Sequence, residues 1–194
     1  MAHTISKAIG KELSGTARLS VGKVPNFTKD VPKSIVKEYD DLRLVDGGMA
    51  FNIPIPSVIH PKRKADIIIV MDASDGMIGK ALKKSEIYAK HHKLLLPPIN
   101  YDQMEKQALN IFASDTPNIP TVIHLSRVVD RKHVLYPSSV PKDYSSKVPT
   151  LKFQYSPDEF NRLTDVTEAN LAQSIEPIKA AIIRKIEQHS GFAQ

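Results

Sequence analysis

The clearest feature of the chain is a continuous apolar run at residues 66–72 that is bounded at each end by an aspartate. A short, β-branched run of this kind is typical of a strand that is buried on both faces of a parallel sheet. Residues 77–92 follow with apolar side chains at helical spacing and lysines on the opposite side, which predicts an amphipathic helix. A buried strand followed by such a helix predicts a βα unit and therefore an α/β fold.

The rest of the pattern predicts strands and helices that alternate along the chain. Strands or extended segments are expected at residues 42–45, 51–56, 121–129 and 151–155. Helices are expected at residues 101–113, after a capping box formed by Ser156 and Glu159, and after Ser174 and Pro177. This alternation predicts a mostly parallel sheet that is covered by helices on both faces.

Composition places these elements in one folded domain. With 194 residues, of which 41% are hydrophobic and 25% charged, the chain can bury a core of its own. Residues 1–40 are polar, lysine-rich and too poor in apolar side chains to fold alone. We therefore expect a polar N-terminal segment at residues 1–40 and the domain at residues 41–190.

Several classes of protein are disfavoured by what the chain lacks. Zero cysteines exclude a disulfide framework, a thiol nucleophile and thiolate metal sites. No apolar run approaches the roughly 20 residues of a membrane span, and the first residues have no apolar signal core. These features predict a cytoplasmic protein.

The net charge of +6, from 27 Lys and Arg against 21 Asp and Glu, favours anionic partners. A modest positive charge serves solubility equally well. Aromatic residues make up 6% of the chain and tryptophan is absent, which speaks against a surface that stacks bases. Neither a glycine-rich phosphate loop nor a zinc-ligand spacing is present, so neither nucleic acid nor a cofactor is expected.

The first candidate for chemistry is Asp46, on the turn Asp46-Gly47-Gly48 that follows the strand expected at residues 42–45. A carboxylate on a turn of two glycines, which let a ligand approach the backbone, is placed as a general base would be. A plain turn with no catalytic role explains the same residues.

A second candidate is Asp72, because it ends the buried strand at the edge where open α/β sheets bind ligands. With Ser74 and Asp75 it can ligate a divalent cation through oxygen atoms, an arrangement similar to the Asp-x-Ser-x-Ser metal site of von Willebrand A-type adhesion domains. Gly76 stands where that site has its second serine. A cluster that caps the following helix is therefore favoured over a metal site.

Two further signals are weak. The basic residues 62–64 include Arg63, whose guanidinium can bind a phosphate, but a short charge run is also typical of a solvated turn. Ser14 gives a partial match to the Gly-x-Ser-x-Gly nucleophile motif, with Glu12 where the first glycine belongs.

Several short motifs follow one another along the chain: Val45-Asp46-Gly47-Gly48, Phe51-Asn52-Ile53-Pro54, Pro61-Lys62-Arg63, Asp72-Ala73-Ser74, Pro120-Thr-Val-Ile-His124 and Phe153-Gln154-Tyr155. In this order they resemble the catalytic domain shared by cytosolic phospholipase A2 and fungal lysophospholipases. The resemblance covers nearly the whole chain. It implies the C-terminal portion of a patatin-like, three-layer α/β/α domain with a mostly parallel sheet.

The resemblance also implies a reaction, the hydrolysis of phospholipid or lysophospholipid acyl esters by a serine–aspartate dyad at a membrane surface. The role of general base carries over onto Asp46. Gly47 and Gly48 would then border the bound substrate, and Arg63 would contact the lipid phosphate. No metal is implied.

The family's serine motif and its oxyanion-hole glycines lie far N-terminal to the acidic motif and have no counterpart in this chain. Ser14 is too close to Asp46 to replace that serine. We therefore expect an acyl-hydrolase segment that supplies Asp46, with the N-terminal half of the domain missing and with self-association through an open sheet edge. The alternative is a non-catalytic remnant of the fold that binds lipid or protein.

Overall fold

The computed structural model describes residues 22–44, 47, 51–74, 79–144 and 152–191. The chain divides into two compact units, Met1–Met49 and Ala50–Gln194. In the first unit, β1 (Gly22–Pro25) pairs with β2 (Asp41–Leu44) in antiparallel fashion. The Asn26 side chain closes this hairpin by donating hydrogen bonds of 2.7 Å to the carbonyl oxygens of Val36 and Tyr39.

The second unit is built on a three-stranded sheet with the order β3-β5-β4. β3 (Ile67–Asp72) and β5 (Thr121–Ser126) are parallel, which confirms the two strands expected here. β4 (Leu109–Phe112) is antiparallel to β5. The sheet is therefore mixed rather than mostly parallel, because the short connection between β4 and β5 folds back and contains no helical crossover.

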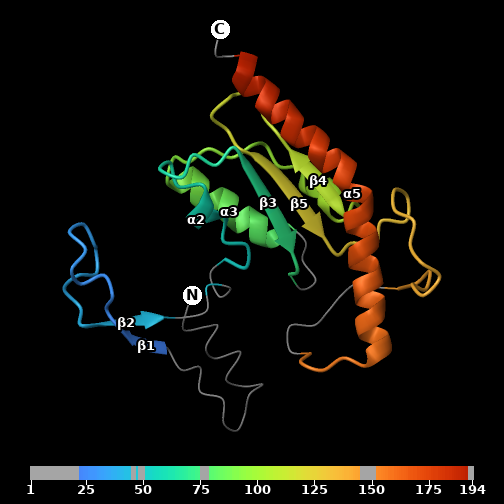
Figure 1. Cartoon of the computed structure of the whole chain (residues 1–194), viewed down its shortest axis with the longest axis horizontal. Helices are drawn as coiled ribbons and strands as arrows, with labels where there is room; N and C mark the ends of the chain where they lie inside the picture. Colours follow the sequence, from blue (N-terminus) through green and yellow to red (C-terminus); the bar gives the residue numbers. More distant parts are fainter. Residues whose placement is uncertain (1–21, 45–46, 48–50, 75–78, 145–151, 192–194) are drawn as a thin grey trace. The chain divides into compact units, whose positions relative to one another are not determined.

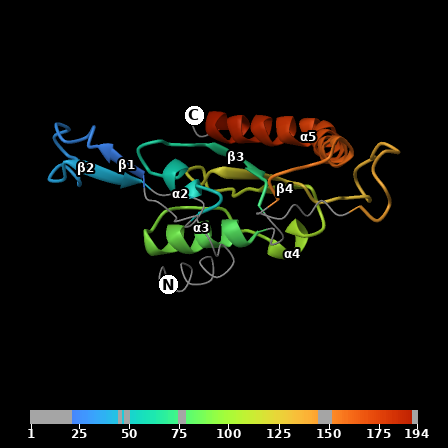
Figure 2. The ribbon, with the colours of Figure 1, turned by 90° about the horizontal axis from the view of Figure 1, so that it is seen from below.

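Helices cover both faces of this sheet (Figures 1 and 2). α2 (Ile55–Val58) and α3 (Lys80–His91) lie on one face, and α5 (Pro157–Gly191) packs against β4 and β5 on the other. Among the helices that the structure describes, none is both long and apolar enough to cross a bilayer.

The hydrophobic core lies between α3 and the sheet. Its buried side chains come from every layer of this half of the unit: Ile53, Ile55, Ile68, Val70, Ala81, Leu82, Met104, Phe112 and Val122. All six residues of β5 are buried, as a strand between two neighbours and two helical layers requires. The confirmed helix α3 contributes the apolar face that its sequence pattern predicts.

The helix expected at residues 101–113 is wrong. The chain forms only the short α4 (Tyr101–Met104) and then enters β4. Residues 109–112 alternate between the two faces of the sheet, and Asn110 and Phe112 are buried toward the core. Met104, Ala108 and Ile111 are spaced for a helix, but pairing with the buried strand β5 decides the conformation.

Three other sequence predictions also differ from the structure. Residues 55 and 56, the end of the segment expected to be extended, instead begin α2, which tolerates Pro56 because a proline fits the first helical turn. Residues 152–155 form no strand. The two helices expected after Ser156 and Ser174 are one continuous helix, α5, with Pro177 inside it.

The capping box that opens α5 is confirmed. The Ser156 backbone N–H donates to Glu159 at 3.0 Å, and the Glu159 N–H donates to the Ser156 hydroxyl at 3.3 Å. Ser174 caps no helix, because its hydroxyl donates to the Asn170 carbonyl one turn earlier at 2.6 Å. Buried residues on both sides of Pro177 pack α5 against the rest of the unit, so the helix continues through the proline.

Candidate functional site

The carboxyl ends of β3 and β5 lie side by side because the two strands are parallel (Figure 1). Asp72 and Ser126, the last residues of the two strands, are register partners. This is the edge at which open α/β sheets bind ligands. Polar side chains from several segments meet here.

A buried ion pair joins the two strands at this edge. Asp72 Oδ2 lies 2.9 Å from His124 Nε2, and both side chains are 0% exposed. Strand alternation explains the contact: His124 is the register partner of Val70, so Asp72 lies two residues further along the same face. Since an ionised carboxylate can only accept hydrogen bonds, we assign the donated proton to His124 Nε2.

The environment favours the ionised form of Asp72. Burial raises the pKa of its carboxyl group, but hydrogen bonds from His124 and Ser74 and the charge of His124 together outweigh burial, and the pKa lies below its usual value of 3.8. The backbone N–H of Ser74 donates to Asp72 Oδ1 at 2.8 Å. Both carboxylate oxygens are therefore bound within the protein.

The segment at residues 72–74 is also held from two other sides. Arg127 Nη2, just after β5, donates to the carbonyl oxygens of Ala73 at 2.7 Å and Ser74 at 3.2 Å. Asn52 Nδ2 donates to the Ser74 hydroxyl at 3.3 Å. A chain of hydrogen bonds thus runs from His124 through Asp72 and Ser74 to Asn52.

A second polar network fixes α5 to the same end of β5. Asn170 is buried and its Nδ2 donates to the carbonyl oxygens of Ser126 at 3.2 Å and Val128 at 3.0 Å. The Tyr136 hydroxyl donates to Asn170 Oδ1 at 2.6 Å. Every polar atom of the Asn170 amide is therefore used in positioning the helix.

The pair of Asp72 and His124 has the composition of the acid–imidazole part of a catalytic triad. It lacks an accessible nucleophile, because both side chains are fully buried. In the part of the chain that the structure describes, His124 Nδ1 has no hydrogen-bond partner, and the Ser126 hydroxyl instead accepts from the Val128 N–H at 3.4 Å. The pair therefore positions the segment at residues 72–74 through hydrogen bonds inside the protein.

The structure does not test the dyad, since Asp46, Gly48 and Ser14 lie outside the described residues. Gly47 is described and exposed. Arg63 is exposed in a turn in which its N–H donates to the His60 carbonyl at 2.8 Å. This turn precedes β3, so Arg63 lies at the opposite end of the strand from Asp72, roughly 20 Å away for six residues.

The helix-cap interpretation of Asp72 is wrong, whereas the metal interpretation stays a prediction because it includes Asp75. Its carboxylate oxygens are occupied by His124 and Ser74. α3 begins after Gly79, whose backbone has a φ of 83° and which provides no side-chain cap. Asp75 and Gly76 lie outside the described residues, and within the described part no three acidic or histidine side chains form a group that could hold a metal ion.

Sequence reasoning missed the pairing of Asp72 with His124. The signal was a histidine inside the apolar strand Thr121–Ser126, where a neutral or charged imidazole needs a buried partner. An aspartate at the end of the neighbouring parallel strand is a natural partner. The pairing depends on strand order, which the local pattern does not contain.

Comparisons with known proteins agree on one group. No family model matches the chain. Human cytosolic phospholipase A2 zeta is 27% identical in an alignment of 178 positions that covers 82% of this chain and 21% of the zeta protein. The chain is a distant homologue of cytosolic phospholipase A2. It spans about a fifth of the length of the curated relative that it matches.

Solved structures of a cytosolic phospholipase A2 show the same fold. Human GIVD cytosolic phospholipase A2 matches with a TM-score of 0.63 and 20% identity over 77% of this chain and 22% of that one. The same human protein in complex with methyl gamma-linolenyl fluorophosphonate matches 96% of this chain and 29% of that one, with a TM-score of 0.61. The mixed α/β structure of this cytosolic phospholipase A2 homologue thus corresponds to part of the larger fold.

Removal of the buried charge at Asp72 should destabilise the homologue. We expect Asp72→Asn to lower the free energy of unfolding at pH 7 by about 3 kcal/mol, since breaking a buried pair leaves its partner uncompensated. The pKa of Asp72 is lowered in the folded state, so its stabilisation is complete above about pH 4 and is lost as the pH falls through the folded pKa. The difference between the two proteins should shrink below pH 4 in urea unfolding experiments.

A suitable control is Asp102→Asn, which removes an exposed carboxylate and should change stability by less than about 0.5 kcal/mol. An Asp72→Asn protein as stable as this control at pH 7 would show that the buried pair does not hold the two strands together.

Proposed function

We propose that the chain is the part of a phospholipase-type acyl-ester hydrolase that supplies the aspartate of a serine–aspartate dyad. The observation that carries this proposal is the homology to cytosolic phospholipase A2, combined with the motif Val45-Asp46-Gly47-Gly48. The chain corresponds to about a fifth of that relative, which supports a nucleophile in a part of the fold that this chain does not supply. The substrate class is a phospholipid or lysophospholipid, and the setting is the cytoplasmic surface of a membrane.

The proposed chemistry gives Asp46 the part of general base. Its carboxylate accepts the proton of a serine hydroxyl as the serine oxygen attacks the acyl carbon. The proton then passes to the departing alcohol oxygen, and water hydrolyses the acyl-serine ester in a second, similar step. A carboxylate can do this without an imidazole where a site of low polarity raises its pKa.

Other residues would bind the substrate. Gly47 and Gly48 leave room for the ester to approach the backbone. Arg63 is exposed between two lysines, so its planar guanidinium is free to contact a lipid phosphate through two N–H groups. The hydrogen bonds from His124 through Asp72 and Ser74 end at Asn52, which follows the acidic turn closely in the sequence.

The isolated chain should be folded but inactive. We expect no hydrolysis of a fluorogenic acyl ester or of a lysophospholipid above the level given by the Asp46→Ala variant, because the serine nucleophile is absent. The measurement is ester turnover by the purified chain, with circular dichroism to show that it is folded. Ser14→Ala is the matched control. Turnover that is lost in both Asp46→Ala and Ser14→Ala would instead show a complete dyad within this chain.

A second candidate function is binding of another polypeptide without catalysis, and the open edge of β3 favours it. β3 pairs only with β5 among the strands that the structure describes. On its α5-facing side, Ile69 is 51% and Met71 is 62% exposed. An apolar edge strand of this kind offers both backbone hydrogen-bonding groups and hydrophobic surface to a partner.

The neighbouring flank of α5 extends this apolar surface. The flank along β4 carries Pro177 and Arg184, which line a groove there. Side chains on the opposite flank, toward β3, recur at helical spacing: Leu171, Ile175, Ile182 and Ile186. Three of these four are among the exposed large hydrophobic residues. We define this flank together with Ile69 and Met71 as the β3-edge surface, and propose that it receives the rest of a phospholipase-type fold.

Without that partner, the β3-edge surface should drive self-association. We expect the weight-average mass in analytical ultracentrifugation to rise with protein concentration, and Met71→Lys to shift the chain toward the monomer because a charge on an edge strand opposes pairing. Leu135→Lys, which replaces a large apolar residue that is even more exposed elsewhere in the same unit, should leave association unchanged. A chain that stays monomeric at high concentration would argue against this surface as an interface.

A further inference from the structure

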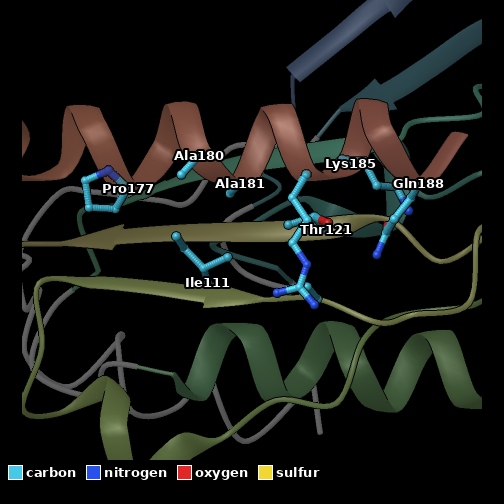
Figure 3. A pocket seen from close by; sticks show the side chains of 9 residues that line it. Ile111, Thr121, Pro177, Ala180, Ala181, Lys185 and Gln188 are labelled. Atoms are coloured by element: carbon cyan, nitrogen blue, oxygen red, sulfur yellow. The ribbon is translucent and has the colours of Figure 1, made fainter. Parts of the chain in front are cut away.

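A groove of about 330 Å³ runs along the β4 flank of α5 and lies apart from the candidate site. Figure 3 shows Pro177, Ala180 and Ala181 on the side of α5 that faces the strands, opposite Ile111 of β4. Thr121, the first residue of β5, also lines it. The Asp72 and Ser126 edge lies at the other end of β5, so the groove cannot belong to that site.

The lining of the groove changes from apolar to cationic along the helix. Pro177 and Ala180 are followed one turn later by Ala181 and Arg184, and then by Lys185 and Gln188. Because positions four residues apart share a helix flank, these side chains form two rows along the same groove. One end is bordered by small apolar residues and the other by two cations and an amide.

Small side chains create the apolar end. Alanine at positions 180 and 181 and the compact ring of Pro177 leave part of Ile111 uncovered beneath α5. The volume is at the lower end of the range of about 300–1000 Å³ that is usual for ligand pockets. The groove therefore has room for one alkyl chain but is small for a lipid with two.

The cationic end has little negative charge of its own. Lys185 is 2% exposed, and its ammonium donates to the neutral carbonyl oxygens of Pro117 at 3.0 Å and Ile119 at 2.7 Å. Arg184 pairs with Asp115 at 3.5 Å, but both side chains are largely exposed. An ion pair of this kind contributes little, so a ligand carboxylate can replace Asp115 beside Arg184.

We propose that this groove binds a single long alkyl chain that ends in a carboxylate, the chemistry of a free fatty acid. The chain lies against Ile111, Pro177 and the two alanines, and the carboxylate lies beside Arg184 with Lys185 adding to the local positive potential. The assignment rests on the lining of the groove, which has an apolar end and a cationic end along α5, as a fatty acid has an apolar chain and an anionic head. It does not depend on the proposed hydrolytic function, because the groove is on the α5 face of the sheet and the Asp72 side chain is on the α3 face.

Binding of oleate, measured by equilibrium dialysis with radiolabelled ligand below its aggregation concentration, tests the proposal. We expect one oleate per chain. Ala180→Leu should fill the groove and weaken binding about tenfold or more, whereas Ala172→Leu, at an exposed position of the same helix outside the groove, should not. Circular dichroism of each variant separates loss of binding from loss of folding.

Charge variants test the position of the carboxylate. Arg184→Gln should weaken oleate binding about tenfold, which is the scale of one charge-assisted hydrogen bond, and should leave binding of methyl oleate unchanged. Asp115→Asn should strengthen oleate binding, because it removes the competing carboxylate. Arg162→Gln, on α5 outside the groove, is the control. Absence of stoichiometric oleate binding, or equal effects of Arg184→Gln on the acid and its ester, would overturn the proposal.

Discussion

The ion pair between Asp72 and His124 is the contact on which the rest of the larger unit depends. It locks the carboxyl end of β3 to β5, the strand that contacts β3, β4 and α5 and contributes Val122 to the core beneath α3. A buried pair tolerates little movement, since either partner alone would be a costly buried polar group. The register of the two parallel strands, and with it the division of their side chains between the α3 and α5 faces, follows from this contact.

Further contacts connect this end of the sheet to the helices on both of its faces. Toward α3, the hydrogen bonds through Ser74 reach Asn52, while the core packs Val70 against the helical layer. Toward α5, Asn170 ties the helix to the backbone just beyond the last residues of β5. On the α3 face of the sheet, the side chains are thus buried in the hydrophobic core or joined by the hydrogen bonds of Asp72. The α5 face is covered over β5 and only partly over β4, and it exposes the apolar side chains of β3.

This asymmetry fits a chain that corresponds to about a fifth of cytosolic phospholipase A2 zeta. The hydrogen bonds among His124, Asp72, Ser74 and Asn52 fix residues 72–74 from inside the unit. The β3-edge surface is different, because its apolar side chains are exposed and one edge of β3 has no partner strand among the described residues.

Local pattern was sufficient to predict β3, α3 and the capping box of α5, because each is specified by residues that are close in sequence. It failed at β4, where the spacing of Met104, Ala108 and Ile111 suits a helix and only pairing with β5 selects the strand. It also failed at Pro177, where packing on both sides keeps one helix intact. The partnership of Asp72 with His124 depends on strand order and could not be predicted from either segment alone. The role of Asp46 rests on motif resemblance, since its surroundings lie outside the described residues.

Residue-resolved amide hydrogen exchange tests most directly whether this chain is a partial sheet organised around β5. We expect the slowest exchange in β5, which is paired on both sides, and alternation in β3, where every second amide points away from β5 at an open edge. Slow exchange at every residue of β3, as slow as in β5, would show that the edge is already covered. That result would contradict the claim that the outer edge of β3 is open for another polypeptide to pair with.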